Sequence, residues 1–323
     1  MKKLRNTIAC GVAALALLAT GLTSCTGDFD NINTSKDKPT PEDVDRDNAW
    51  AAFIQTMQRN VFAEGANAYQ LADNLLGDSY AGYFGQAQDW DSGSNSTCYA
   101  FPTAKWKDEP YKQAYNNVMS SWNILRQKVD SASVVFALGE VVKVQAMHRV
   151  TDAYGPIPYS MIGENGQIQV PYDSQEKVYD KFFEELDAAI KVLTEHRTDA
   201  ISAKADYIYG GSAEKWCKLA NSLKLRLAMR IVYANEAKAR EMAESAVNSE
   251  VGVITSNADN ARLTSFGADG NPIYVAVNYN KPADCLTGGD THAAADIICY
   301  MNGYSDPRRE KYFTKSEWEG HTY

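Results

Sequence analysis

The sequence contains few of the residue patterns from which catalytic and metal sites are built. It has four histidines among 323 residues, and these stand far apart, without the spacing of metal ligands. It lacks an HExxH motif, a phosphate-binding P-loop, a dinucleotide-binding glycine pattern and a GxSxG nucleophile elbow. An oxygen-rich run at residues 89–95 departs from the calcium-loop pattern. We therefore predict a protein without enzymatic activity, bound metal or cofactor.

Cysteine pairs and an excess of basic residues are also lacking. None of the six cysteines belongs to a CxxC pair, which argues against zinc and thioredoxin-like sites. Cys217 is expected in the core, and the spacing leaves open whether Cys285 and Cys299 form a disulfide. The formal net charge is −9, from 32 basic and 41 acidic residues. Because nucleic-acid binding needs basic patches, we do not expect nucleic acid as a partner.

Long apolar runs are absent except at the amino terminus. There, basic residues precede an apolar run over residues 8–22, which is typical of a secretory signal. The run ends in Leu-Thr-Ser-Cys, the lipobox pattern of bacterial lipoproteins, with a chance cysteine after an ordinary signal as the alternative. We predict a lipoprotein signal peptide at residues 1–24 and lipid attachment at Cys25. Residues 25–41 are polar, as expected of a flexible tether.

The most strongly patterned stretch is helical. Its large apolar residues recur at steps of three and four, which draws one stripe down a helix: Trp216, Leu219, Leu223, Leu227 and Ile231. Gly210 and Gly211 break the chain before this helix, and Ser212 stands at the N-cap position. A second helix is predicted over residues 236–247. The two form an αα-hairpin, which needs neighbouring helices to cover its apolar face.

The remainder of residues 42–323 is predicted to supply these neighbours within one mostly α-helical domain. Further helices are expected from Thr40–Asp43 through Val61, at 67–84, 111–129 and 134–154, over the stretch from Val178 to Leu193, and at 292–302. Asp173 and Glu176 form a predicted capping box for the helix that follows them. Residues 85–110 and 251–281 are expected to be irregular, with a short strand at 273–277.

The stretch DYIYGGSAEKWCKLANSLKLRLAMRI, residues 206–231, resembles the SusD/RagB-type outer-membrane lipoproteins. Three further segments resemble the same family: LLGDSYAGYF, TDAYGPIPYS and NGYSDPRREKYF. The resemblance implies an all-α scaffold of tetratricopeptide-like helical pairs with loops laid over it. Because family members continue well beyond this length, we expect that a carboxyl-terminal part, with its ligand residues, is missing here.

The resemblance also implies a role and partners. Members are surface-exposed Bacteroidetes lipoproteins that bind nutrient and deliver it to a SusC-type TonB-dependent transporter. We therefore expect a non-catalytic protein that binds glycan at the outer membrane. Peptide or another nutrient is the alternative ligand, and a surface glycoside hydrolase is a less favoured function.

Aromatic residues in polar loops supply the candidate glycan site. The chain has 19 Tyr, 10 Phe and 6 Trp, and flat rings beside amides and carboxylates suit the faces and hydroxyl rims of sugars. The first cluster consists of Trp90, Asp91, Asn95, Tyr99 and Trp106, and the second of Tyr274, Asn278 and Tyr279 with Asn280. The alternative for the tryptophans at 90 and 106 is that they pin a loop to the scaffold.

Overall fold

The computed structural model describes residues 50–62, 65–85, 104–164, 169–263, 270–280, 291–315, 317–318 and 321–322. The predicted signal peptide, the lipid-attachment residue Cys25 and the tether lie outside these residues.

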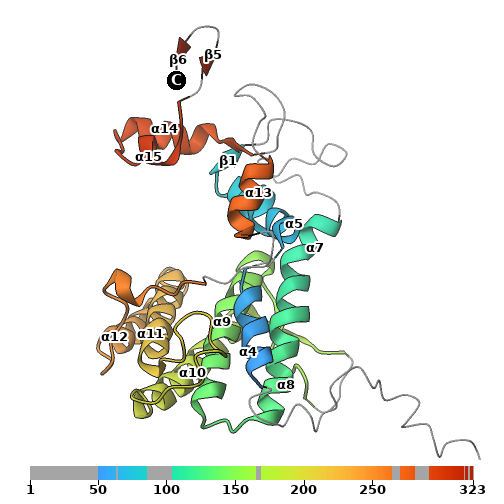
Figure 1. Cartoon of the computed structure of the whole chain (residues 1–323), viewed down its shortest axis with the longest axis vertical. Coiled ribbons are helices and arrows are strands. Elements are labelled where there is room, and N and C mark those ends of the chain that lie inside the picture. The colour runs from blue at the N-terminus through green and yellow to red at the C-terminus, as the bar shows by residue number, and fades with distance from the viewer. Residues whose placement is uncertain are drawn as a thin grey trace, which may run out of the picture. The chain divides into compact units, whose positions relative to one another are not determined.

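Helices dominate the described part of the chain (Figure 1), which confirms the all-α prediction. The longer helices are α4 (Trp50–Asn60), α7 (Ala104–Gln113), α8 (Ser120–Lys128), α9 (Val134–Tyr154), α10 (Gln175–Glu195), α11 (Ala213–Arg230), α12 (Glu236–Val247), α13 (Pro272–Asn280) and α14 (Ala295–Gly303). Shorter helical segments are α5 (Ala66–Tyr69), α6 (Asp78–Tyr80), α15 (Arg309–Tyr312), the 3₁₀ turn η4 (Asn257–Asp259), and the π-helical η1 (Gln70–Gly77) and η3 (Ala114–Met119).

Strands are short and pair two by two. They are β1 (Phe84–Gly85), β2 (Ile157–Pro158), β3 (Tyr172–Asp173), β4 (His292–Ala293), β5 (Glu317–Trp318) and β6 (His321–Thr322). The antiparallel pairs are β1 with β4, β2 with β3, and β5 with β6. Each pair therefore fastens two turns together and does not form a sheet layer of its own.

Helix α9 lies at the centre of the core. Its residues are buried almost without a break from Ala137 to Thr151, because α4, α8, α10 and α11 all pack against it. Gly139 lets α9 approach closely: a Cβ there would lie 2.6 Å from Leu125 and 3.6 Å from Ile54. The α9–α10 and α11–α12 pairs, visible side by side in Figure 1, extend this core as helical pairs.

A buried charge cluster ties α9 to α10. Lys143 is 1 % exposed, and its Nζ lies 2.9 Å from both Glu140 and Glu185. The same ammonium lies 3.8 Å from the centre of the Trp122 ring. Burial raises the pKa of the Glu185 carboxyl. The ammonium is therefore held by carboxylates and an aromatic face where water does not reach it.

The predicted caps are partly confirmed. Ser212 accepts a hydrogen bond from the Lys215 N–H at 3.4 Å and so caps α11 as expected. The prediction of an Asp173 cap for α10 is wrong, because the neighbouring Ser174 accepts from the Lys177 N–H. Asp173 is buried and instead accepts from the Ser160 N–H at 2.7 Å, which braces the β2–β3 pair.

Two predicted irregular stretches contain helix. Residues 104–110 belong to α7 although Pro110 removes one backbone donor, and packing of α7 against η1 compensates for that loss. Residues 272–280 form α13, not a strand at 273–277. The helix predicted at 67–84 ends at Tyr80, and the one predicted at 292–302 begins at Ala295. The residues left over at 84 and at 292–293 belong to β1 and β4, which pair with each other.

Candidate functional site

The first predicted aromatic cluster is not placed by the structure. Trp90, Asp91, Asn95 and Tyr99 lie outside the described residues. The backbone of Trp106 lies on α7, in a helix and not in the loop that we predicted. This cluster therefore remains a prediction.

The second predicted set lies on α13. Asn271 starts this helix, because its Oδ1 accepts from the Ile273 N–H at 2.9 Å and Pro272 occupies the first turn. Tyr274 is 69 % exposed, and Asn278 is also exposed. Four residues apart on a helix, these two side chains share a face. The backbone of Tyr279 lies on the same helix.

The opposite side of α13 is anchored. Ala276 is buried in a small cluster with Tyr69 of α5, and α13 also packs against η1. The exposed tyrosine and amide are thus presented by a helix that is fixed from behind. Binding groups on such a rigid element lose little conformational entropy when they meet a ligand.

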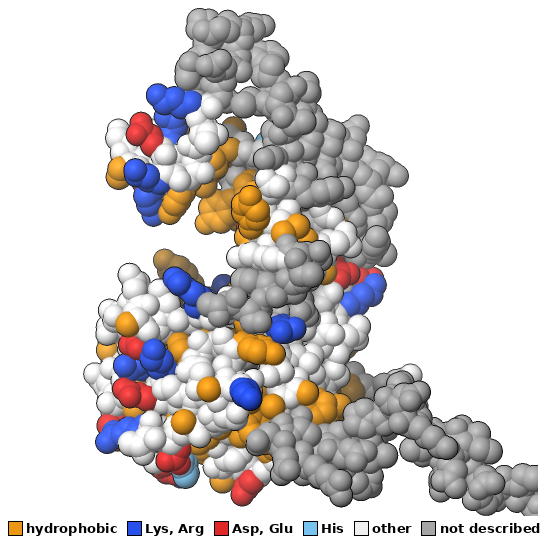
Figure 2. Space-filling view, in the orientation of Figure 1, with side chains coloured by type: hydrophobic (Ala, Val, Ile, Leu, Met, Phe, Trp, Pro, Cys, Tyr) orange, Lys and Arg blue, Asp and Glu red, His pale blue; other side chains and the backbone are white. Residues whose placement is uncertain are grey.

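A groove of about 530 Å³ opens at the amino end of α13. Asn271, Pro272 and Ile273 form part of its wall, and α4, α9, α11 and the segment before α13 supply the rest. Most of the lining is apolar and includes Phe62, which is 47 % exposed. Hydrophobic side chains gather over α13 in the space-filling view (Figure 2). The volume is within the range of small-ligand pockets.

Part of the groove wall is positioned by Asp206, a residue that we did not predict from the sequence. Its carboxylate is 2 % exposed. One oxygen accepts from the side-chain amide of Gln58 at 2.9 Å and from two backbone N–H groups at 3.0 and 3.3 Å. The other accepts from the Gly211 N–H at 2.8 Å and from the indole N–H of Trp216 at 2.7 Å. Since Gln58 and Trp216 line the groove, Asp206 fixes part of its wall.

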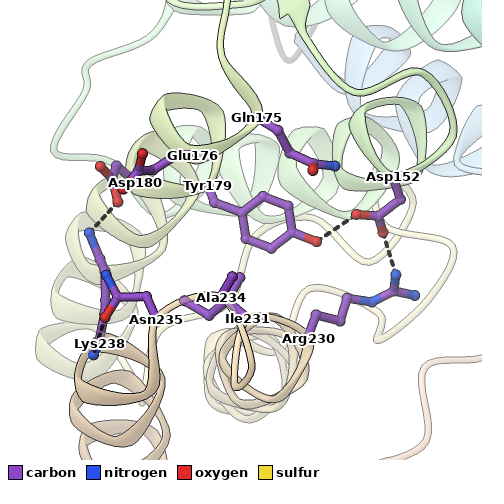
Figure 3. A pocket seen from close by; sticks show the side chains of 10 residues that line it. All are labelled: Asp152, Gln175, Glu176, Tyr179, Asp180, Arg230, Ile231, Ala234, Asn235 and Lys238. Atoms are coloured by element: carbon purple, nitrogen blue, oxygen red, sulfur yellow. Dashed lines mark hydrogen bonds and ion pairs between the residues drawn. The ribbon is translucent and has the colours of Figure 1, made fainter.

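A second, polar pocket of about 500 Å³ lies between the start of α10 and the α11–α12 turn (Figure 3). Asp152 accepts from the Tyr179 hydroxyl at 2.6 Å and from the Arg230 guanidinium at 2.5 Å, and Lys238 pairs with Asp180. Both cations of this pocket are therefore held by its own carboxylates. The pairs join α9, α10, α11 and α12 to one another.

His148 lies behind Asp152. Its side chain is 3 % exposed, and Nδ1 lies 3.2 Å from the Asp152 carboxylate. Burial lowers the pKa of this imidazole. Since Nδ1 donates to the carboxylate in the neutral ring, Nε2 is the unprotonated nitrogen, and it has no hydrogen-bond partner among the described residues.

The described residues offer no metal centre. Within those ranges, no group of three or more His, Cys, Asp or Glu side chains could hold an ion. Cys217 is buried, as predicted, and Cys299 carries an exposed free thiol, whereas Cys285 lies outside the described residues. Among the helices that the structure describes, none has both the length and the apolar character needed to cross a membrane.

Comparison with known proteins agrees with this helical architecture. A family profile described as "Susd and RagB outer membrane lipoprotein" matches residues 31–323. The chain belongs to the SusD/RagB family. No curated protein matches it.

Solved structures give the same assignment. The chain is 46 % identical to a SusD homologue from Bacteroides uniformis, with a TM-score of 0.73, over 86 % of this chain and 57 % of that one. It is 34 % identical to a chitin-binding SusD homologue from Flavobacterium johnsoniae, with a TM-score of 0.72, over 81 % and 53 %. A homologue from Bacteroides thetaiotaomicron is 36 % identical, with a TM-score of 0.70, over 84 % and 54 %. The chain therefore spans little more than half the length of these relatives.

Proposed function

We propose that the protein is a non-catalytic outer-membrane lipoprotein that binds glycan at the cell surface and delivers it to a SusC-type TonB-dependent transporter. Membership of the SusD/RagB family supports this role, as does the likeness to a homologue described as chitin-binding. The observation that carries the proposal is the exposed face of α13, which presents Tyr274 and Asn278, while the amino end of the same helix lines the groove.

The chemistry of this face suits a sugar. A pyranose ring has a C–H face that packs on a flat aromatic ring, and its hydroxyls accept from and donate to an amide. Tyr274 supplies the ring and Asn278 the amide, one helical turn apart. Such a site binds through one or two contacts, so we expect modest affinity and fast release. Fast release is what delivery to a transporter requires.

The proposal also assigns roles to the lipid anchor and to the first aromatic cluster. Lipid on Cys25 would hold the protein at the membrane through the polar tether that follows. A single acyl chain binds membranes only weakly, so stable anchoring needs the multiple acylation that lipoprotein cysteines receive. Trp90 and its neighbours would extend the glycan contact beyond α13.

The test is affinity electrophoresis of the protein from Thr26 onward through gels that contain single neutral polysaccharides, chitin derivatives among them. We expect retardation by at least one polysaccharide. Tyr274→Ala should weaken retardation about tenfold, as removal of a stacking ring does. Tyr233→Ala is the matched control, because Tyr233 is 100 % exposed on the α11–α12 turn and lines neither cavity.

Four outcomes would overturn parts of this proposal. Retardation that is equal in Tyr274→Ala and in the control would remove α13 from the site, and Trp90→Ala would then test the first cluster. Retardation by no polysaccharide would refute the binding of neutral glycan. Release of reducing sugar from a bound polysaccharide would contradict the non-catalytic role, and failure to co-purify with a TonB-dependent transporter would contradict delivery.

A further inference from the structure

The charge of the groove beside α13 is opposite to that of the chain. Three arginines, Arg59, Arg226 and Arg262, line the groove, and the described lining residues include no Asp, Glu or Lys. The whole chain carries a net charge of −9. A local excess of positive charge in an acidic protein is a specific feature of this cavity and does not follow from the overall composition.

Two of the three guanidiniums have no hydrogen-bond or ion-pair partner among the described residues. Arg59 lies over the ring of Tyr207 at 4.8 Å, so its position is fixed by that contact. Arg226 and Arg262 are exposed, and neither has an ion pair or hydrogen bond with any residue that the structure describes. In the polar pocket, by contrast, Arg230 and Lys238 are both paired with carboxylates.

The two free arginines come from two different segments. Arg226 lies on the face of α11 that also presents Leu219 and Leu223 to the groove, at helical steps of seven and three. Arg262 lies between Ala261 and Leu263, which line the groove as well. Each guanidinium thus stands at an apolar wall. A guanidinium binds a carboxylate or sulfate through two parallel hydrogen bonds, and it does so more strongly where water is partly excluded.

We infer that the groove takes an anionic saccharide, one that carries carboxylate or sulfate groups, with Arg226 and Arg262 as its ligands. This inference rests on the proposed glycan-binding function and narrows its substrate class. The sugar rings pack on the apolar walls and on Tyr274, and the acidic substituents pair with the two arginines. Neither the resemblance nor the chitin-binding relative points to acidic sugars; the arginines of this chain do.

The test compares matched probes by isothermal titration calorimetry at low salt. One pair is a galacturonate hexamer and its fully methyl-esterified, neutral form, and the other is a chondroitin sulfate hexasaccharide and its desulfated form. We expect at least one acidic probe to bind about tenfold more tightly than its less charged partner, with the difference falling as salt is raised. Which pair shows the difference distinguishes carboxylate from sulfate recognition.

Substitutions of the two arginines test whether the groove causes the preference for acidic probes. Arg226→Gln with Arg262→Gln should abolish the preference and leave the affinity for the neutral, methyl-esterified hexamer unchanged, whereas Arg226→Lys should retain part of the preference. Arg240→Gln is the control, since Arg240 lies exposed on α12, pairs among the described residues only with Glu236, and lines neither cavity. Circular dichroism checks that each variant is folded.

The outcomes separate this inference from the proposed function. Equal affinity for acidic and neutral probes, with sensitivity to Tyr274→Ala, would overturn the inference and leave glycan binding in place. A preference that survives in the double variant would also overturn it. If no saccharide of either kind binds, both fail. Competition by octanoate, an anion with an apolar tail and no sugar, would reassign the groove to anionic amphiphiles and overturn the inference.

Discussion

Replacing Asp206 with asparagine removes the charge that organises the loop between α10 and α11. The amide oxygen would retain the three donors at one carboxylate oxygen, but the new NH₂ group would face the N–H groups of Gly211 and Trp216. Both residues are buried. Two buried donors without acceptors cost ~1–3 kcal/mol each. We therefore expect Asp206→Asn to lower the free energy of unfolding by about 4 kcal/mol.

Urea unfolding followed by far-ultraviolet circular dichroism measures this change. Asp199→Asn is the matched control, because Asp199 is exposed and its one ion pair within the described ranges is with His196; such a surface pair contributes under ~1 kcal/mol. Asp206→Asn should shift the urea midpoint strongly and leave the denaturant slope unchanged. In a double-mutant cycle with Trp216→Phe, the combined loss should be smaller than the sum. A loss from Asp206→Asn no larger than that of the control would refute the assignment of Asp206 as an organising residue.

Three further predictions follow from single sites. Gly211→Ala should destabilise the protein by more than ~3 kcal/mol in the same urea assay, because φ is +91° and a Cβ would lie 2.1 Å from the Ile201 carbonyl oxygen. Gly252→Ala is the control: φ is +77° but the space around it is open, so it should cost only ~1 kcal/mol. Equal losses of stability in the two variants would contradict this reasoning. Lys143→Met should cost ~3–5 kcal/mol, because it leaves the buried Glu140 and the half-buried Glu185 carboxylates without their cation; a neutral result by thermal unfolding would contradict this. In the folded protein the pKa of His148 lies below its usual 6.5, because burial disfavours the charged ring. As the pH falls through about 6.5, the unfolded chain therefore takes up a proton that the folded chain does not, and stability is lost. Unfolding measured from pH 7.5 to 5.5 should show a shallower decline in stability for His148→Gln than for the unchanged protein, and an equal decline would refute this role.

Helices with a strong apolar period or clear caps were predictable from the sequence. Helix α9 occupies the predicted residues 134–154, and α12 the predicted residues 236–247. In α12, Asn235 accepts from the Lys238 N–H and marks the start. Such local signals act within one turn of the chain, so they can be read from the sequence alone.

Elements whose conformation depends on distant partners were not predictable. The β-branched sequence of α13 favours a strand locally, yet it is helical because Asn271 and Pro272 start a helix and Ala276 packs on Tyr69, about two hundred residues earlier in the chain. Helix α7 likewise keeps Pro110 because it packs against η1. A capping box was assigned to Asp173, but the Ser160 backbone competes for that carboxylate.

The candidate site was likewise predictable from the sequence only in part. The exposure of Tyr274 and Asn278 agrees with their choice as surface residues, although the reason given, a loop, was wrong. Asp206 was missed because its five donors come from residues as distant as Gln58 and Trp216. The sequence did contain one signal. Asp206 directly precedes a glycine-containing turn, and an aspartate at such a position commonly accepts hydrogen bonds from the backbone N–H groups that follow it.

The periodicity of α11 links the core to the groove. Trp216, Leu223 and Leu227 are buried, and this packing fixes how the helix is turned about its own axis. With that rotation fixed, position 226, three residues after Leu223, must stand at the wall of the groove. The packing of the helix thus places the Arg226 guanidinium over an apolar cavity, with no described partner to neutralise it. A free charge held there by the core is more consistent with a ligand-binding role than with solubility alone, because any outward-facing position of the same helix would serve solubility equally well.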